Sequence, residues 1–467
     1  MILDPSAPNP HKHTDDEIAQ FWDLMERMVE LSDVSQDETN TALVGYMKRS
    51  SDAYMVYINS DRDLCRMAAI IIESPLFKQR EEFCLSKLLS LLSIDLLELN
   101  MKFLISYILL WNSKNDLNSL DTMLNYQGFN VFYNTCYTQF AYLTKYGEEK
   151  TDNPDIDPGK EVDAAEIEMR IIDDMKQISI VLLDLLFQIF KYCKCNVENV
   201  QIIDDFFVYY VMVSLRSDTV TDMFNNVKFR LLLSLNEQYM MFDREYEIEN
   251  KIFKYLCSSS AHSSFTELLL LQFNRVQDKS LKIMMCKILY LILCSTKNNL
   301  SMNFFYLNDL NVLTDVLIRE LQNISENEEI LRNYYLRVLP HLLNNTELCN
   351  THYKKEELKS LLRYLSSTDN ISGGESPTQE HQLTAKLAAN TLRRVPWLGE
   401  NIEDCDSDSA SGKSSSLGIP PMTTLGGSDK KPGQFYANPE VVYSAESLGR
   451  RKARPPPPPP ARKVRMP

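Results

Sequence analysis

The sequence predicts an all-α protein, an irregular armadillo- or HEAT-like α-solenoid followed by a disordered, proline-containing tail. Apolar residues recur three and four positions apart from Asp15 to about Leu365, which is the spacing of a buried helical stripe. Only 13 glycines occur in 467 residues, and the Val/Ile/Thr alternation of strands is scarce. From Ala164 onward, helix pairs recur about every 40 residues, although no strict repeat consensus is visible. A compact helical bundle is therefore the alternative.

The predicted helical body spans residues 15–398 and follows a flexible arm at residues 1–14. Within it, residues 147–164 are acidic, contain two prolines and have too few apolar residues to pack, so we expect a surface loop. A second loop, rich in Ser and Gly, is expected from Ser366 to Gln379. One last amphipathic helix, Gln382 to Val395, should end where the next residue is a proline, because the residue before proline leaves helical geometry.

Composition and charge narrow the function classes. The hydrophobic content of 44% is enough for a sizeable core, and the net charge of -15 would repel a phosphate backbone, so we expect no nucleic-acid partner. The ten cysteines lie mostly in apolar stretches, which favours reduced thiols in a cytoplasmic protein. The longest apolar stretches fall short of the ~20 residues that span a bilayer, so no integral membrane contact is expected.

Signatures of catalysis and of cofactor binding are missing from the sequence. It has no Gly-rich phosphate loop and no nucleophile motif, and its six histidines are scattered. Cys193 and Cys195 stand too close together for the usual zinc pair, and no second pair follows at finger spacing. We therefore expect no enzyme activity, no cofactor and no metal site.

The tail, residues 399–467, is expected to be disordered because it is poor in hydrophobes. Its six prolines, 455–460, favour a polyproline II helix, and basic residues flank them on both sides, which favours recognition by SH3 domains in either orientation. A stiff spacer or a profilin ligand is the alternative interpretation. The candidate SH3-binding residues are Lys452, Arg454, Pro455, Pro457, Pro458, Pro460 and Arg462.

Three segments carry a family resemblance. Lys297 to Asn323, Leu331 to Leu348 and His352 to Leu358 resemble the leucine-rich domain of the WISH/DIP/SPIN actin-nucleation activators. The resemblance covers most of the body and is strongest over residues 281–398. A helical body joined to a proline-containing tail is similar to the fungal members of this family, the low-dye-binding type.

This resemblance implies that the chain binds the actin-related protein 2/3 complex and activates it without a preformed filament. The product would be linear filaments that seed branched networks at endocytic sites, in cortical actin patches. The sequence has no N-terminal SH3 domain, unlike animal members, so it would be a ligand of SH3-domain endocytic adaptors. The alternative is a non-nucleating helical scaffold that clusters SH3 proteins at such sites.

Polar residues of the family-like segment are the candidate contacts with that complex: Asn303, Asn308, Asp309, Arg319, Arg332 and Arg337. Arg337 should share a helix face with Tyr334 and His341, because they lie three and four residues away. A purely local interpretation competes with partner binding. In it, Asn308 or Asp309 caps a helix starting near Leu310, Arg332 pairs with Glu328, and Pro340 kinks its helix.

Overall fold

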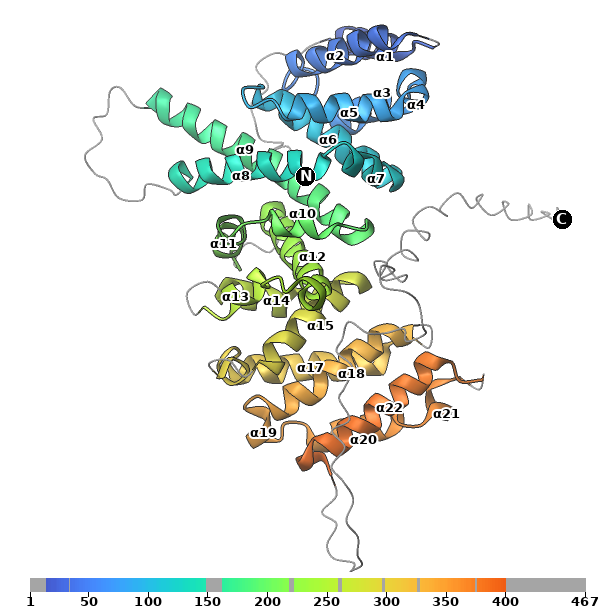
Figure 1. The fold of residues 1–467 in the computed structure, drawn as a ribbon, viewed down its shortest axis with the longest axis vertical. Coiled ribbons are helices and arrows are strands. Elements are labelled where there is room, and N and C mark those ends of the chain that lie inside the picture. Colours follow the sequence, from blue (N-terminus) through green and yellow to red (C-terminus); the bar gives the residue numbers. More distant parts are fainter. Residues whose placement is uncertain are drawn as a thin grey trace, which may run out of the picture.

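The structure, a computed structural model, describes residues 14–32, 34–147, 162–217, 222–258, 263–295, 299–325, 328–373 and 376–399. These residues form helices, with no strand among them and one isolated β-bridge, between Tyr54 and Ile58. In chain order (Figure 1) the elements are α1 (Asp15–Val29), α2 (Gln36–Asp52), α3 (Asp61–Glu73), α4 (Pro75–Gln79), α5 (Glu81–Leu92), α6 (Leu99–Asn115), α7 (Asn118–Asn125), α8 (Gly128–Tyr146), α9 (Val162–Tyr192), α10 (Val197–Gln201), α11 (Asp205–Val213), α12 (Met223–Tyr246), α13 (Lys251–Leu256), α14 (Ser263–Arg275), α15 (Lys279–Cys294), α16 (Leu300–Asn303), α17 (Leu307–Asn323), α18 (Glu329–Asn344), α19 (Leu348–Thr351), α20 (Lys355–Leu365), α21 (Thr368–Ile371), α22 (Gln379–Arg394) and η3 (Pro396–Leu398).

The helices form two parallel stacks. One stack, here called the spine, is α3, α6, α9, α12, α15, α18 and α22, each packed on the next. The other stack is α5, α8, α11, α13, α14, α17 and α20, whose members pack on the spine helices. The molecule is elongated, with α1 and α2 at one end and α20 and α22 at the other (Figure 1). The predicted α-solenoid is confirmed, and the compact bundle is excluded.

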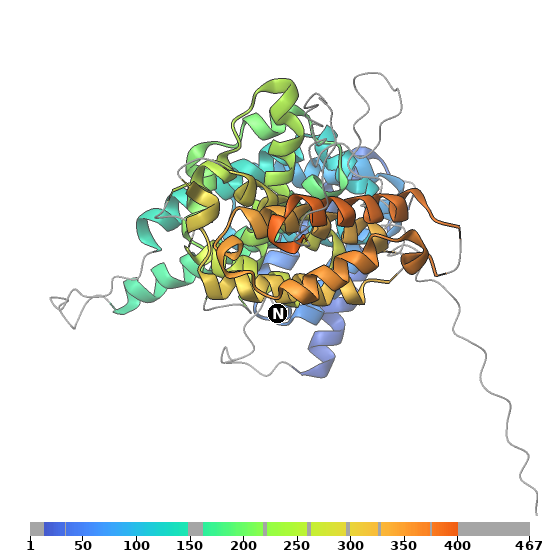
Figure 2. The same ribbon diagram turned by 90° about the horizontal axis from the view of Figure 1, so that it is seen from below.

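Spine helices are buried on several sides, which explains their nearly continuous apolar sequences. On α6 every residue from Phe103 to Leu110 is buried. Most residues of α9 from Ile178 to Phe190 are also buried. Viewed from below, α20 and α22 lie across the end of the stack and cover the earlier layers (Figure 2). Within the described ranges, no helix combines the length and the hydropathy needed to cross a membrane.

Helix boundaries agree with the predictions in part. Val395 has φ -103° and ψ 96°, so α22 ends before the proline as expected, but it begins at Gln379, where Thr378 caps it in a capping box. The Ser/Gly-rich loop before it contains the short helix α21, so that prediction was incomplete. Val162 and the two residues after it, expected in the acidic loop, are helical in α9. The rest of that loop, residues 148–161, and residues 1–13 and 400–467 lie outside the described residues.

Charged contacts join consecutive layers. Lys191 of α9 pairs with Asp278, the N-cap of α15, at 3.2 Å. Lys282 of α15 pairs with Glu320 of α17 at 2.5 Å, and only 7% and 18% of these two side chains are exposed. Because a charge that is buried without a partner is costly, each pair favours a single arrangement of its two helices.

The Lys282–Glu320 pair supplies a test of this arrangement. Burial raises the pKa of the Glu320 carboxyl, but hydrogen bonds from Lys282 and Arg319 outweigh it and hold the pKa below the usual 4.5. A carboxylate with a depressed folded-state pKa contributes stability above its unfolded pKa and loses it as pH falls through the folded value.

We therefore expect Glu320→Gln to lower the free energy of unfolding by about 2 kcal/mol at pH 7, measured in urea, because it leaves Lys282 buried without a charged partner. The difference from wild type should shrink as pH falls below ~4.5, because the Glu320 carboxyl then binds a proton in the unfolded chain before it does so in the folded protein. Glu356→Gln is the matched control, an exposed carboxylate with no ion pair among the described residues. An equal loss of stability at pH 7 in both variants would contradict the pairing argument.

Candidate functional site

One side of the spine carries interleaved cations and aromatic rings from α6 to α22. We call this side the spine face. Its residues are Lys114, Asp184, Phe187, Lys191, Arg230, Glu237, Lys287, Tyr290, Tyr334, Arg337, His341 and Arg394. On α9, α12, α15 and α18 they recur at three-, four- or seven-residue spacing, which places them on one side of each helix. Helices α6 and α22 contribute Lys114 and Arg394.

The first half of the spine face is organised around Asp184 of α9. This carboxylate, with a side chain 9% exposed, pairs with Lys114 of α6 at 2.9 Å and with Arg230 of α12 at 3.6 Å. The Arg230 guanidinium also lies over the ring of Phe187, 4.1 Å from its centroid. One acid therefore connects three consecutive spine helices.

The second half continues from α12 to α18. Glu237 of α12 forms an ion pair with Lys287 of α15, and both side chains are almost fully buried. The Lys287 ammonium lies 5.6 Å from the centroid of the Tyr334 ring on α18, within range of a cation–π interaction. Contacts with α12 on one side and α18 on the other therefore fix the position of the Lys287 ammonium.

At the end of the face, Tyr290, Arg337, His341 and Arg394 come together, and we call them the Arg337 cluster. The rings of Tyr290 on α15 and His341 on α18 meet edge to face with centroids 5.1 Å apart. Arg337 is half-buried, and its Nε is buried with no hydrogen-bond acceptor. Among the described residues no ion pair includes Arg337 or Arg394. The cluster therefore presents positive charge that no neighbouring carboxylate neutralises.

Burial governs the titration of this cluster. It lowers the pKa of the Arg337 guanidinium from its ordinary value. Burial, followed by the nearby charge of Arg394, lowers the pKa of His341 to about 4, so this imidazole is neutral at pH 7. Burial and the adjacent Cys294 raise the pKa of Tyr290 to about 12. The cluster thus offers guanidinium donors beside two neutral rings, which suits an acidic group with an apolar neighbour.

The other predicted contacts do not lie together with Arg337. Asn303 ends α16 and is exposed, while Asn308 and Arg319 share the exposed outer side of α17, eleven residues apart. Asp309 is half-buried in the first turn of α17, where a carboxylate suits the helix dipole. Arg319 donates to Asn274 Oδ1 and to Glu320 Oε1, each at 3.0 Å.

Two local interpretations from the sequence were wrong. Helix α17 begins at Leu307 with Tyr306 as its N-cap and no side-chain cap bond, so neither Asn308 nor Asp309 caps it. Arg332 pairs with Glu329 and not with Glu328, because Glu328 lies outside the first turn of α18 and pairs with Lys279. Pro340 does lie inside α18, as expected.

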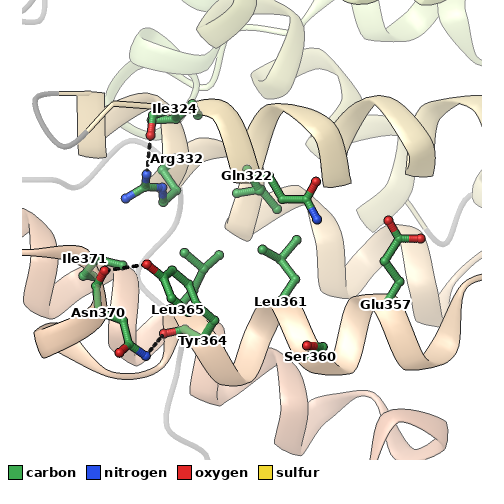
Figure 3. Close-up of a pocket in the computed structure, with 11 residues that line it drawn as sticks. Gln322, Ile324, Arg332, Glu357, Ser360, Leu361, Tyr364, Leu365, Asn370 and Ile371 are labelled. Atoms are coloured by element: carbon green, nitrogen blue, oxygen red, sulfur yellow. Dashed lines mark hydrogen bonds between the residues drawn. The ribbon is translucent and has the colours of Figure 1, made fainter.

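Arg332 is 5% exposed and lines a recess of about 570 Å³ between the C-terminal end of α17 and α20, which lines it from Glu357 to Leu365 (Figure 3). Its guanidinium donates to the Ile324 carbonyl at 2.7 Å. Across the recess, the Tyr364 hydroxyl donates to the Asn370 carbonyl at 2.8 Å and holds the turn before α21. The acid pairing and carbonyl bond of Arg332 give it a structural role, so it is a weak candidate for partner contact.

Cys193 and Cys195 are buried in the turn after α9. Burial raises the pKa of the Cys195 thiol to about 12 and also raises that of Cys193, so both remain protonated. In the described part of the chain, no group of three His, Cys, Asp or Glu side chains is placed to hold a metal ion. The candidate SH3-binding residues, from Lys452 to Arg462, lie outside the described residues.

Comparison with known proteins identifies the family. The model of the SPIN90/Ldb17 leucine-rich domain matches residues 221–358. Over 473 aligned residues the chain is 53% identical to Protein LDB17 of Saccharomyces cerevisiae, covering 97% of this chain and 96% of that protein. The chain belongs to the SPIN90/Ldb17 family. The predicted family resemblance is thereby confirmed.

Two further relatives match smaller parts of this chain. Protein LDB17 of Eremothecium gossypii is 51% identical over 386 residues, which cover 82% of this chain and 83% of that protein. Protein dip1 of Schizosaccharomyces pombe is 34% identical over 178 residues, 37% of this chain and 46% of that protein.

The SPIN90/Ldb17 domain match begins at residue 221, just ahead of α12 in the sequence, and ends in the first turn of α20. It contains Glu237, Lys287, Tyr290 and Arg337, and so most of the second half of the spine face. Sequence reasoning found Arg337 and His341 from their spacing. It missed Tyr290 and Arg394, because their proximity depends on how α15, α18 and α22 stack.

The proximity of Arg394 to His341 can be tested by titration. In protein with labelled histidine, the NMR shifts of His341 should report a pKa of about 4. Arg394→Gln should raise this pKa, without reaching 6.5, because burial is the larger cause. Arg393→Gln, on another side of α22, should leave it unchanged. A wild-type pKa near 6.5 would show that His341 is not buried against α15 and α22.

Proposed function

We propose that this protein binds the actin-related protein 2/3 complex and activates it without a preformed filament, producing linear filaments that seed branched networks during endocytosis. Membership of the SPIN90/Ldb17 family supports the proposal through the activity that the WISH/DIP/SPIN resemblance implies. The observation that carries the proposal in this chain is the Arg337 cluster, a partly buried basic surface of which Tyr290, Arg337 and His341 lie within the segment matched by the family model.

The spine face would be the docking surface. Lys191 and Lys287 are buried and fix the helices beneath this face. Lys114 and Arg230, with side chains 51% and 31% exposed, are held by Asp184, so little of their side-chain entropy remains to be lost on binding. Arg337 and Arg394 keep donors for acidic groups of the partner. Arginine beside tyrosine is a frequent composition of interface hot spots. We place the centre of the contact at Arg337 and extend it along α15 and α18.

Activation of this kind requires no catalytic residue in this chain. We propose that the protein is not an enzyme. A binding protein favours the active arrangement of a two-state complex by its higher affinity for that arrangement. A stacked solenoid suits this role, since each layer is fixed to the next and the whole face keeps its shape. The partner's subunits would thus be held in one relative position.

The tail would recruit the body to its place of action. The prolines 455–460 with their basic flanks would bind SH3-domain adaptors, with profilin as a further ligand of the same run. Tethering raises the local concentration of the body where such adaptors gather, which we take to be cortical actin patches. A non-nucleating scaffold that clusters SH3 proteins is the second candidate function, and only the tail favours it.

Pyrene-actin assembly tests the first proposal. Purified protein added to the actin-related protein 2/3 complex, without filament seeds, should shorten the lag. Arg337→Ala should weaken the effect so that at least about 30-fold more protein is needed, because a central arginine contributes 2 kcal/mol or more. Arg170→Ala, an exposed arginine on α9, is the control and should act as wild type does.

Deletion of residues 449–467 separates the two candidate functions. Lag shortening in vitro should survive this deletion if the body is the activator. An unchanged lag with the full-length chain would reject activation and leave the scaffold.

The contribution of the basic flanks is tested by substitution in the tail. Replacing Arg454 and Arg462 together by Gln should weaken SH3 binding more than either replacement alone, because a base at each end allows two docking orientations. Isothermal titration with a purified SH3 domain measures the change. Unchanged affinity in the double variant would show that the flanking charge does not determine the contact.

A further inference from the structure

A short acidic segment follows the folded body. Residues 400–408 contain the carboxylates Glu400, Glu403, Asp404, Asp406 and Asp408 and no base, and the first lysine after them is Lys413. We call residues 400–408 the acidic stretch. Five negative charges in nine residues make this segment a candidate ligand for a basic surface.

The Arg337 cluster is such a surface. Three buried bases of the body have a carboxylate: Lys282 pairs with Glu320, Lys287 with Glu237, and Arg332 with Glu329. A fourth, Lys228, donates instead to the carbonyl and hydroxyl of Ser214. Arg337 and Arg394 have none among the described residues. The cluster therefore carries two positive charges and an unused Arg337 Nε donor, which an acidic ligand can pair with.

The acidic stretch begins beside this cluster. The Trp397 indole Nε1 donates to the Leu343 carbonyl of α18 at 3.4 Å, and the Asn344 amide donates to the Arg394 carbonyl at 2.8 Å. Along α18, Leu343 is six residues from Arg337, which is a rise of about 9 Å. Nine extended residues span up to ~30 Å, so the acidic stretch is long enough to reach Arg337.

We propose that residues 400–408 occupy the Arg337 cluster in the free protein, with their carboxylates on the guanidinium groups of Arg337 and Arg394. The acidic stretch is then an intramolecular ligand that an acidic element of the partner must displace. This inference rests on the proposed function. It names the segment that fills the docking site when no partner is bound. Because the stretch is tethered, its effective concentration is on the order of millimolar, so a weak contact suffices.

The competing acidic segment is less well placed. Residues 148–161 also carry several carboxylates, but they join α8 to α9, whereas the Arg337 cluster lies on α15, α18 and α22. The basic end of the tail, after Arg450, has the wrong sign of charge for this surface. The acidic stretch therefore fits best in both charge and position.

Photocrosslinking in the full chain tests this contact. With Cys405→p-benzoylphenylalanine, irradiation followed by peptide mass spectrometry should place most crosslinks on α15, α18 and α22 around Tyr290 and His341. The crosslink yield should fall at least fivefold in the Arg337→Gln/Arg394→Gln background. Crosslinks spread over the body, or a yield unchanged by these substitutions, would overturn the proposal.

Two controls keep the result interpretable. Arg393→Gln removes a neighbouring exposed charge of α22 and should leave the yield unchanged, whereas an equal loss would indicate diffuse attraction and overturn the assignment. In the protein without arginine substitutions, about 0.5 M NaCl should lower the yield by screening. A crosslink yield that does not change with salt would also contradict the proposal. This measurement does not depend on whether the double variant folds.

The crosslinking assay contains no actin and no actin-related complex, so its outcome is independent of the proposed activation. A partner-binding measurement adds the functional consequence. Replacing the five carboxylates of residues 400–408 by their amides should raise affinity for the complex at least threefold. The same replacement of Glu148, Glu149, Asp152, Asp155 and Asp157 should not, and an equal rise in both variants would contradict competition at the cluster.

Discussion

The structure depends on charged contacts that join one spine helix to the next. Hydrophobic burial drives the helices together, but it is non-directional and would tolerate several alignments of such uniformly apolar helices. An acid such as Asp184, which pairs with Lys114 on one side and Arg230 on the other, is satisfied in only one alignment. The pair of Glu237 with Lys287 does the same between α12 and α15. These contacts fix both the stacking and the positions of the cations on the spine face.

The proposed function depends on the end of the spine face, where this pattern stops. Up to Lys287 the bases of the spine face are neutralised by carboxylates, but Arg337 and Arg394 are not. The surrounding layers hold these arginines beside neutral rings, so their donors are available without rearrangement. A rigid face that ends in unneutralised charge can recognise an acidic element, whether it belongs to a partner or to the acidic stretch of the same chain.

Much of the fold could be predicted from sequence, because helices of this protein carry local signals. The three- and four-residue spacing of apolar residues predicted the helical body, and the proline after Val395 predicted the end of α22. The role of Asp184 has no local sequence signal, since its partners are 46 and 70 residues away. For the same reason the sequence yielded Arg337 with His341 on one helix but missed Tyr290 and Arg394 on two others. Long-range stacking, and not local pattern, brings that site together.

A cryo-electron microscopy structure of this protein bound to the actin-related protein 2/3 complex tests the account most directly. We predict that the complex covers the spine face over α15, α18 and α22, with one of its carboxylates within ion-pair distance of Arg337. A complex in which the outer side of α17 is buried and Arg337 faces solvent would contradict it.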